Sequence, residues 1–167
     1  MSNSEATPLA TITSQPLDEA AMTALSRRIA GAVHTPATIF LRGDLGAGKT
    51  TFTRALVQAL GHTGRVKSPS YGLLEHYELG PVNILHLDLY RISDPGELEF
   101  LGIEDLLEPS TLLVVELPEQ GGAALPAPDI EIVFSPGPGK NPASRCLAFR
   151  AYSDSGVGLC RFIDTLL

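Results

Sequence analysis

The segment Gly43-Asp44-Leu45-Gly46-Ala47-Gly48-Lys49-Thr50 constrains the fold more than any other part of the chain. It matches the phosphate-binding pattern G-x-x-x-x-G-K-[ST] at every fixed position. The apolar run 38–41 before it is typical of a buried strand, and residues 49–60 after it place apolar side chains on one helical face. Strand, glycine-rich loop and helix in this order predict an anion-binding site in an α/β domain.

The loop itself predicts a site for a nucleoside triphosphate and Mg²⁺. Its glycines let backbone N–H groups converge on phosphate oxygens, and the positive end of the following helix dipole is directed at the same point. We expect Lys49 to reach the β- and γ-phosphates and the Thr50 hydroxyl to take a place on Mg²⁺. The competing interpretation is a glycine-rich turn whose lysine is merely solvated. The expected nucleotide contacts in this segment are Asp44, Leu45, Gly46, Ala47, Gly48, Lys49, Thr50 and Thr51.

The whole chain predicts an α/β fold with a P-loop NTPase-like sheet, flanking helices and antiparallel strands in a mixed sheet. We expect a single domain over 1–167, with residues 1–15 loosely ordered because they are small and polar. The run 112–115 is apolar throughout, which is typical of a central strand buried on both faces. The other expected strands are 71–79, 84–90, 130–134 and 146–152, and the expected helices are 18–33, 94–101, 103–107 and 159–167.

The charge of the chain argues against direct nucleic-acid binding. Its formal net charge is −7, and Lys and Arg form no run anywhere, whereas phosphate neutralisation needs a clustered basic surface. The first fifteen residues have neither the basic nor the apolar region of a secretory signal, and no apolar stretch approaches the length that spans a bilayer. We therefore expect a cytoplasmic protein that does not contact a membrane.

Two carboxylates follow apolar strands and are candidates for the chemistry beside the phosphate loop. Asp88 comes after 84–87, and Glu116 comes after 112–115. A phosphate loop needs a carboxylate at the end of a neighbouring strand to hold Mg²⁺, directly or through water, beside the Thr50 hydroxyl. Glu116 ends the more apolar strand, so Thr50 and Glu116 are the expected metal contacts, and Asp88 is expected to orient the water or the outer shell of the metal. The expected catalytic set is Lys49, Asp88 and Glu116. Either acid could instead be a solvated residue at a strand end.

Several motifs occur in an order that resembles one protein family. They are Gly-Asp-Leu-Gly-Ala-Gly-Lys-Thr-Thr (43–51), Ser-Pro-Ser-Tyr (68–71), His-Leu-Asp-Leu-Tyr-Arg (86–91), Asp-Pro-Gly-Glu-Leu (94–98), Leu-Gly-Ile-Glu-Asp (101–105) and Val-Glu-Leu-Pro-Glu (115–119). Together they resemble the TsaE family of small bacterial ATPases in tRNA threonylcarbamoyladenosine biosynthesis, over about residues 16 to 150. The H-x-D-x-Y-R element combined with this loop is far more specific than the loop alone.

The resemblance implies a magnesium-dependent ATPase, weakly active alone, that drives cycling of a TsaB–TsaD complex. That complex transfers a threonylcarbamoyl group to adenosine in ANN-decoding tRNAs, so this chain would meet tRNA only indirectly. The family's nucleotide-sensing switch maps to Ser68, Pro69 and Ser70, which adds Ser68 and Ser70 to the expected nucleotide contacts. The family usually has Thr where Ser70 stands and Trp where Leu117 stands.

Some alternatives remain open from the sequence. His86 and Tyr90 could be polar residues on an open strand face, and Arg91 could be a surface ion-pair partner. A small-molecule kinase could use the same loop, but it would need a lid with arginines, and residues 121–128 are short and contain none. A nucleotide-gated binding module without catalysis is a third possibility, which the intact lysine and carboxylates disfavour.

Overall fold

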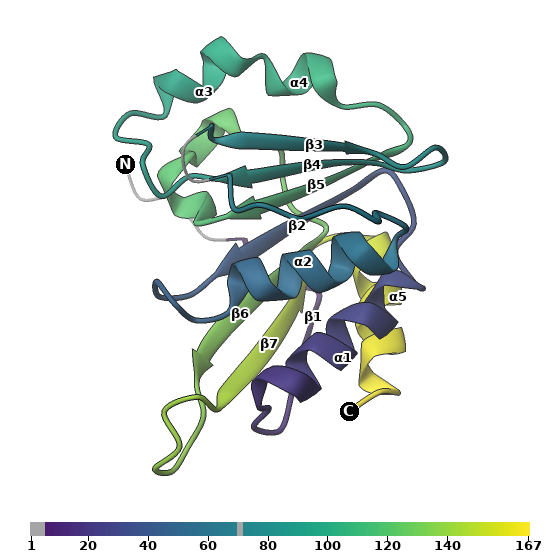
Figure 1. Ribbon diagram of the computed structural model, residues 1–167, viewed down its shortest axis with the longest axis vertical. Helices are drawn as coiled ribbons and strands as arrows, with labels where there is room; N and C mark the ends of the chain where they lie inside the picture. Colours follow the sequence, from purple (N-terminus) through teal and green to yellow (C-terminus); the bar gives the residue numbers. More distant parts are fainter. Residues whose placement is uncertain (1–5, 70–71) are drawn as a thin grey trace.

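The computed structural model describes residues 6–69 and 72–167, and within them the protein is built on one mixed seven-stranded sheet (Figure 1). The strand order is β1-β7-β6-β2-β5-β4-β3. The four central strands, β6, β2, β5 and β4, are parallel to one another. On one side β3 pairs antiparallel with β4, and on the other β7 pairs antiparallel with β6 and β1 with β7. Their bounds are β1 Ala10–Thr13, β2 Ala37–Arg42, β3 Leu74–Glu78, β4 Asn83–Asp88, β5 Thr111–Glu116, β6 Ile130–Pro136 and β7 Arg145–Ala151. The mixed α/β fold predicted from the sequence is confirmed.

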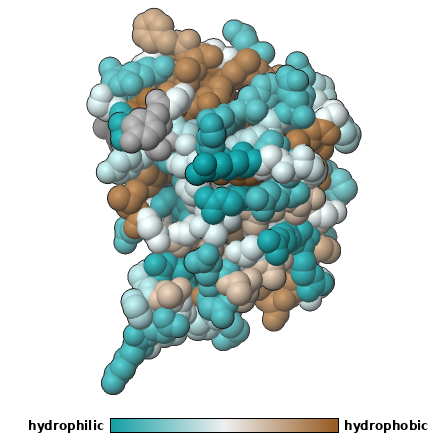
Figure 2. All heavy atoms as spheres, viewed as in Figure 1, coloured by the Kyte–Doolittle hydropathy of each residue, from teal (hydrophilic) through white to brown (hydrophobic). Residues whose placement is uncertain are grey.

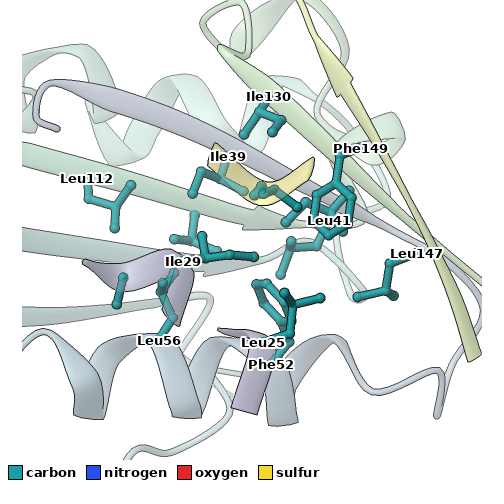
Figure 3. Close-up of a cluster of buried hydrophobic side chains, with 14 of the residues drawn as sticks. Leu25, Ile29, Ile39, Leu41, Phe52, Leu56, Leu112, Ile130, Leu147 and Phe149 are labelled. Atoms are coloured by element: carbon teal, nitrogen blue, oxygen red, sulfur yellow. The ribbon is translucent and has the colours of Figure 1, made fainter. Parts of the chain in front are cut away.

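Three helices cover one face of this sheet: α1 (Glu19–Ala30), α2 (Lys49–Ala59) and α5 (Asp154–Asp164) (Figure 1). The Asp18 side chain caps α1 by accepting a hydrogen bond from the Ala21 amide at 2.8 Å. Figure 3 shows how the apolar stripes of α1 and α2 meet the sheet through interleaved aliphatic and aromatic side chains. The labelled residues of this core are Leu25, Ile29, Ile39, Leu41, Phe52, Leu56, Leu112, Ile130, Leu147 and Phe149.

The opposite face of the sheet is covered over β4 and β5 by α3 (Gly96–Leu101) and α4 (Ile103–Leu106). Side chains alternate along each strand, so Leu85 and Leu87 of β4 pack in this second core, whereas Ile84 packs in the first. Strand β5 is buried along its whole length, as its apolar run predicted. Two 3₁₀ turns, Pro118–Gln120 and Gly122–Ala124, follow β5 and close this side.

The N-terminal segment departs from its expected loose order. Residues Ala10–Thr13 form β1, which pairs antiparallel with β7 from Ala10 opposite Ala151 to Thr13 opposite Ala148. Only alternate residues of this short edge strand are half-buried, so its sequence carries little apolar signal. The expectation for residues 10–13 was therefore wrong.

The last helix also begins earlier than predicted. We expected it over 159–167, but α5 covers Asp154–Asp164, and Ser153 caps it by accepting a hydrogen bond from the Gly156 amide at 3.0 Å. Gly156 and Gly158 lower the helix propensity of the first turns, which hid them from the sequence pattern. Gly156 is required by packing, because a Cβ there would lie 1.9 Å from the carbonyl oxygen of Asp129. Within the described residues, no helix has the length and apolarity needed to cross a membrane.

Candidate nucleotide-binding site

The phosphate loop connects the end of the central strand β2 to the start of α2 (Figure 1). Gly43 has a φ of +149°, and a Cβ there would come 2.9 Å from the side chain and the carbonyl oxygen of Phe134. Gly48, the residue before the first turn of α2, has a φ of +104°. Both positions need glycine, since L side chains rarely adopt these angles. The loop therefore has the backbone shape that directs N–H groups toward one point at a helix N-terminus.

Lys49 is only 5% exposed and is folded over this loop. Its ammonium donates hydrogen bonds to the carbonyl oxygens of Gly43 at 2.7 Å and Asp44 at 2.8 Å. The backbone thus fixes the position of the cation, and the same side chain lines the cavity beside the loop. A buried cation held by neutral carbonyl oxygens is well suited to attract an anion.

The two candidate carboxylates lie at the ends of adjacent parallel strands. Asp88 of β4 and Glu116 of β5 are partners in the strand register, and Leu41 of β2 is the partner of Glu116 on the other side. Strand β5 thus places Glu116 beside the strand that leads into the loop. The Thr50 hydroxyl is 3.1 Å from each carboxylate oxygen of Glu116 and donates to them. The tertiary fold therefore brings Thr50, Asp88 and Glu116 together, as the sequence predicted.

Loop, helix and strand ends enclose a cavity of about 320 Å³. It is lined by Leu45, Gly46, Gly48, Lys49, Thr50, Thr51, Ser68, Asp88, Tyr90, Arg91, Glu116 and Leu117. Asp44 and Ala47, which we also expected to contact nucleotide, belong to the loop but line a neighbouring hollow of about 180 Å³. Ser70 lies outside the described residues. None of residues 121–128, the segment weighed as a kinase lid, is among the residues that line the cavity in the described part of the chain.

A buried histidine is a second hydrogen-bond partner of Glu116. The His86 ring is fully buried, and its Nε2 is 2.9 Å from a carboxylate oxygen of Glu116. Its Nδ1 is buried without a hydrogen-bond partner in the described structure. A carboxylate accepts, so Nε2 carries a proton. The geometry assigns Nε2 as the ring nitrogen that donates to Glu116. The solvated-face interpretation of His86 is therefore wrong.

The environment of Asp88 differs from that of Glu116. Asp88 is half-buried, and one of its oxygens accepts a hydrogen bond from the Tyr90 amide at 3.0 Å. Burial raises the pKa of Asp88 above that of an ordinary carboxyl, and the negative charge of Glu116 raises it further. The Tyr90 amide, His86 and Lys49 oppose this rise without cancelling it. The cavity therefore disfavours two ionised carboxylates in the absence of a cation.

The donor atoms in the cavity fit Mg²⁺. Thr50, Asp88 and Glu116 offer hydroxyl and carboxylate oxygens, which are the hard ligands that Mg²⁺ prefers. Across the described residues, no group of three or more His, Cys, Asp or Glu side chains is placed to hold a metal ion without other ligands. This pattern suits Mg²⁺, which is usually held by one or two carboxylates together with phosphate oxygens and waters.

The loop has a further support that the sequence did not reveal. Arg145, the first residue of β7, donates from Nε to the carbonyl oxygen of Ala47 at 3.2 Å and from a terminal nitrogen to that of Gly46 at 3.5 Å. These contacts tie two carbonyl groups of the loop to the start of β7. Nearly a hundred residues separate the partners, and no spacing pattern links them.

Leu117 also has an unexpected role. It adopts a left-handed conformation, with a φ of +56°, directly after Glu116. Its amide donates to the carbonyl oxygen of Leu41 at 3.1 Å, which extends the β2–β5 pairing past Glu116. Positive φ is uncommon for leucine and is found more often at functional sites than elsewhere. Because the chain turns at Leu117, strand β5 ends at Glu116.

Comparison with known proteins gives consistent results. A family model described as threonylcarbamoyl adenosine biosynthesis protein TsaE matches residues 17–142. The tRNA threonylcarbamoyladenosine biosynthesis protein TsaE of Haemophilus influenzae is 50% identical over 92 residues, which are 55% of this chain and 58% of that protein. The protein of the same name from Bacillus subtilis is 37% identical over 94 residues, which are 56% of this chain and 58% of that protein. The chain thus spans less than two thirds of the length of these relatives.

The fold has a counterpart among solved structures. The crystal structure of Bacillus subtilis YdiB matches with a TM-score of 0.77 and 24% identity, over 94% of this chain and 96% of that one. The family match begins just before α1 and ends in the turn between β6 and β7, so it includes the phosphate loop and both strand-end carboxylates. On this match, the chain belongs to the TsaE family.

Proposed function

We propose that the protein is a magnesium-dependent ATPase of tRNA threonylcarbamoyladenosine biosynthesis. One observation carries the proposal: a single cavity at the N-terminus of α2 is lined by a buried lysine, a hydroxyl donor and two strand-end carboxylates. Lys49, Thr50, Asp88 and Glu116 are the groups that phosphoryl transfer to water requires in P-loop enzymes. The biosynthetic role follows from membership of the TsaE family.

In this proposal each residue has a distinct task. The loop amides and Lys49 bind the phosphates, with the ammonium exchanging its contacts to Gly43 and Asp44 for phosphate oxygens. Thr50 and Glu116 hold Mg²⁺, which supplies neutralisation of phosphate charge when bound. Asp88 orients the attacking water or a water of the metal. Ser68, which lines the cavity, belongs to a nucleotide-sensing segment.

The proposed partners are TsaB and TsaD, which would bind the tRNA and carry out the threonylcarbamoyl transfer in the cytoplasm. The acidic net charge of this chain supports an energy-coupling role rather than direct RNA chemistry. A small-molecule kinase is the weaker alternative, because the segment considered as its lid does not reach the cavity.

The test is phosphate release from ATP with and without Mg²⁺, by the protein alone, with a TsaB–TsaD complex and with small-molecule phosphate acceptors. We expect slow Mg²⁺-dependent release that increases with the complex and not with the acceptors. Lys49→Ala should lower it at least a hundredfold, because one buried charge directed at the phosphates contributes several kcal/mol to the transition state. Lys140→Ala, in the exposed turn before β7, is the matched control. Equal release by Lys49→Ala and the control would refute the site.

A further inference from the structure

The segment 94–108, which contains α3 and α4, has an apolar side chain almost entirely in solvent. Phe100 is 95% exposed, and Leu106 of α4 is also exposed. Figure 2 shows apolar side chains reaching the surface over α3 and α4, at the top of the view, among hydrophilic ones. The inner sides of the two helices are occupied by Leu98 and Ile103, which pack on the sheet. The exposed phenylalanine therefore has no role in the core.

The same segment carries most of the net charge of the protein. It contains six acidic residues and no Lys or Arg, whereas the formal net charge of the whole chain is −7. The rest of the chain is therefore close to neutral. The acidic residues are Asp94, Glu97, Glu99, Glu104, Asp105 and Glu108. A phenylalanine in water, on a segment rich in exposed acidic residues, resembles an anchor residue with a charged rim, as protein interfaces have.

The acidic segment also follows closely after two residues that line the nucleotide cavity. Tyr90 and Arg91 line that cavity, and the chain reaches the start of α3 five residues after Arg91. Leu89 and Ile92 of this connection pack in the same small core as Leu98 and Ile103. Shared packing therefore connects the residues on either side of Tyr90 and Arg91 to α3.

We propose that the α3–α4 surface, residues 94–108, docks a partner protein through an apolar pocket rimmed by Lys and Arg that receives Phe100. The negative charge of this surface disfavours several kinds of binding partner. A second copy of this chain would bring two acidic segments together, and both nucleic acid and anionic lipid would be repelled. A basic protein surface is the occupant that complements both the charge and the exposed ring.

This inference rests on the proposed function, which supplies the TsaB–TsaD complex as the probe. Calorimetry with that complex would compare the wild-type protein with Phe100→Ala and Glu99→Lys. Both residues are exposed, so both variants should fold and keep the basal ATP hydrolysis of the isolated chain. We expect binding at least tenfold weaker for Phe100→Ala, and weaker binding with a smaller salt dependence for Glu99→Lys.

Matched controls exist elsewhere on the chain. Phe162 of α5 is 37% exposed, and Glu78 of β3 is exposed, so Phe162→Ala and Glu78→Lys test an aromatic loss and a charge reversal outside the segment. Both should bind the complex like wild type. If the wild-type protein binds the complex and Phe100→Ala and Glu99→Lys bind it as tightly as the controls do, the proposed docking surface is wrong and the proposed function stands. If wild type neither binds nor responds to the complex, the proposed function fails and this inference with it. Sedimentation that shows a dimer broken by Phe100→Ala would instead identify a second copy as the occupant and overturn the proposal.

Discussion

At the scale of single residues, the position of Glu116 is set by two hydrogen-bond donors, Thr50 and His86. Thr50 contacts both carboxylate oxygens, and the buried His86 ring donates to one of them. Glu116 itself is only 3% exposed, so its charge depends on these partners for compensation. The sequence identified the carboxylate and the hydroxyl from the phosphate-loop pattern. It left His86 undecided, because only the folded structure shows the contact between its ring and Glu116.

His86 should therefore position Glu116, the proposed metal ligand, rather than act in the chemistry. His86→Ala would leave the buried carboxylate without one donor, which costs about 1–3 kcal/mol of folding stability. His86→Gln places an amide N–H near the position of Nε2 and should recover much of that loss. Thermal unfolding and the Mg²⁺ midpoint of nucleotide binding would be measured for both variants. We expect the midpoint to rise for alanine and to return toward wild type for glutamine, whereas equal midpoints in all three proteins would contradict a positioning role.

Asp88 should make the folding stability of the protein depend on pH, and its environment determines the sign of that dependence. Its pKa is raised in the folded protein by burial and by Glu116, so the protonated form is the one that folding favours. The stability it contributes is present below about pH 4, the ordinary pKa of the unfolded carboxyl, and is lost as the pH rises through the folded value.

Asp88→Asn should then be more stable than wild type at neutral pH without Mg²⁺, by less than about 1 kcal/mol because the group is half-exposed. The difference should shrink as the pH falls toward about 4. The amide oxygen of the substituted side chain can still accept from the Tyr90 amide, so the hydrogen bond is preserved. The unfolding midpoints of wild type and Asp88→Asn, measured across this pH range, would test the prediction. A variant less stable than wild type at neutral pH would contradict the raised pKa of Asp88.

At the scale of elements, the strongest local patterns predicted the structure best. The apolar run of β5 and the strand–loop–helix of β2 and α2 are where we expected them, because burial on both faces and glycine geometry leave few alternatives. The helix expected after Asp94 is also present, starting at Gly96, and the Asp94 carboxylate accepts the Gly96 amide at 2.9 Å. Strand β1 and the first turn of α5 were missed, since tertiary contacts and not local propensity determine them. For β1 the determining contact is its antiparallel pairing with the edge of β7.

The two glycines of α5 should respond oppositely to the same substitution. Gly156→Ala forces a methyl group into the backbone of Asp129, which cannot move aside, and should destabilise the protein by about 3 kcal/mol. Gly158→Ala meets no atom within 4 Å and should stabilise by up to about 1 kcal/mol through higher helix propensity. Denaturant unfolding of both variants gives the comparison. Similar effects at the two positions would mean that α5 does not approach the backbone of Asp129 as described.

At the scale of the whole molecule, the charge is arranged asymmetrically. The acidic residues concentrate in the segment 94–108, whereas the phosphate loop and its cavity carry the buried ammonium of Lys49. The small nucleotide is thus attracted to a local cation, and a long polyanion meets an acidic surface. The sequence alone predicted weak nucleic-acid binding from the net charge. It did not single out the segment as a surface, because only the fold shows that Phe100 lies outside the core.

The isolated protein should accordingly bind bare tRNA only weakly at physiological salt. Few phosphates can be neutralised, so little counterion release drives binding, and the affinity should change little with salt concentration. Fluorescence anisotropy with labelled tRNA, over a series of salt concentrations, would measure both quantities with ATP analogue, with ADP and without nucleotide. The TsaB–TsaD complex with the same tRNA is the positive control for the proposed division of labour. A sub-micromolar affinity of the isolated chain with a steep salt dependence would instead require a basic surface on this fold, and would favour direct action on RNA over energy coupling through a protein partner.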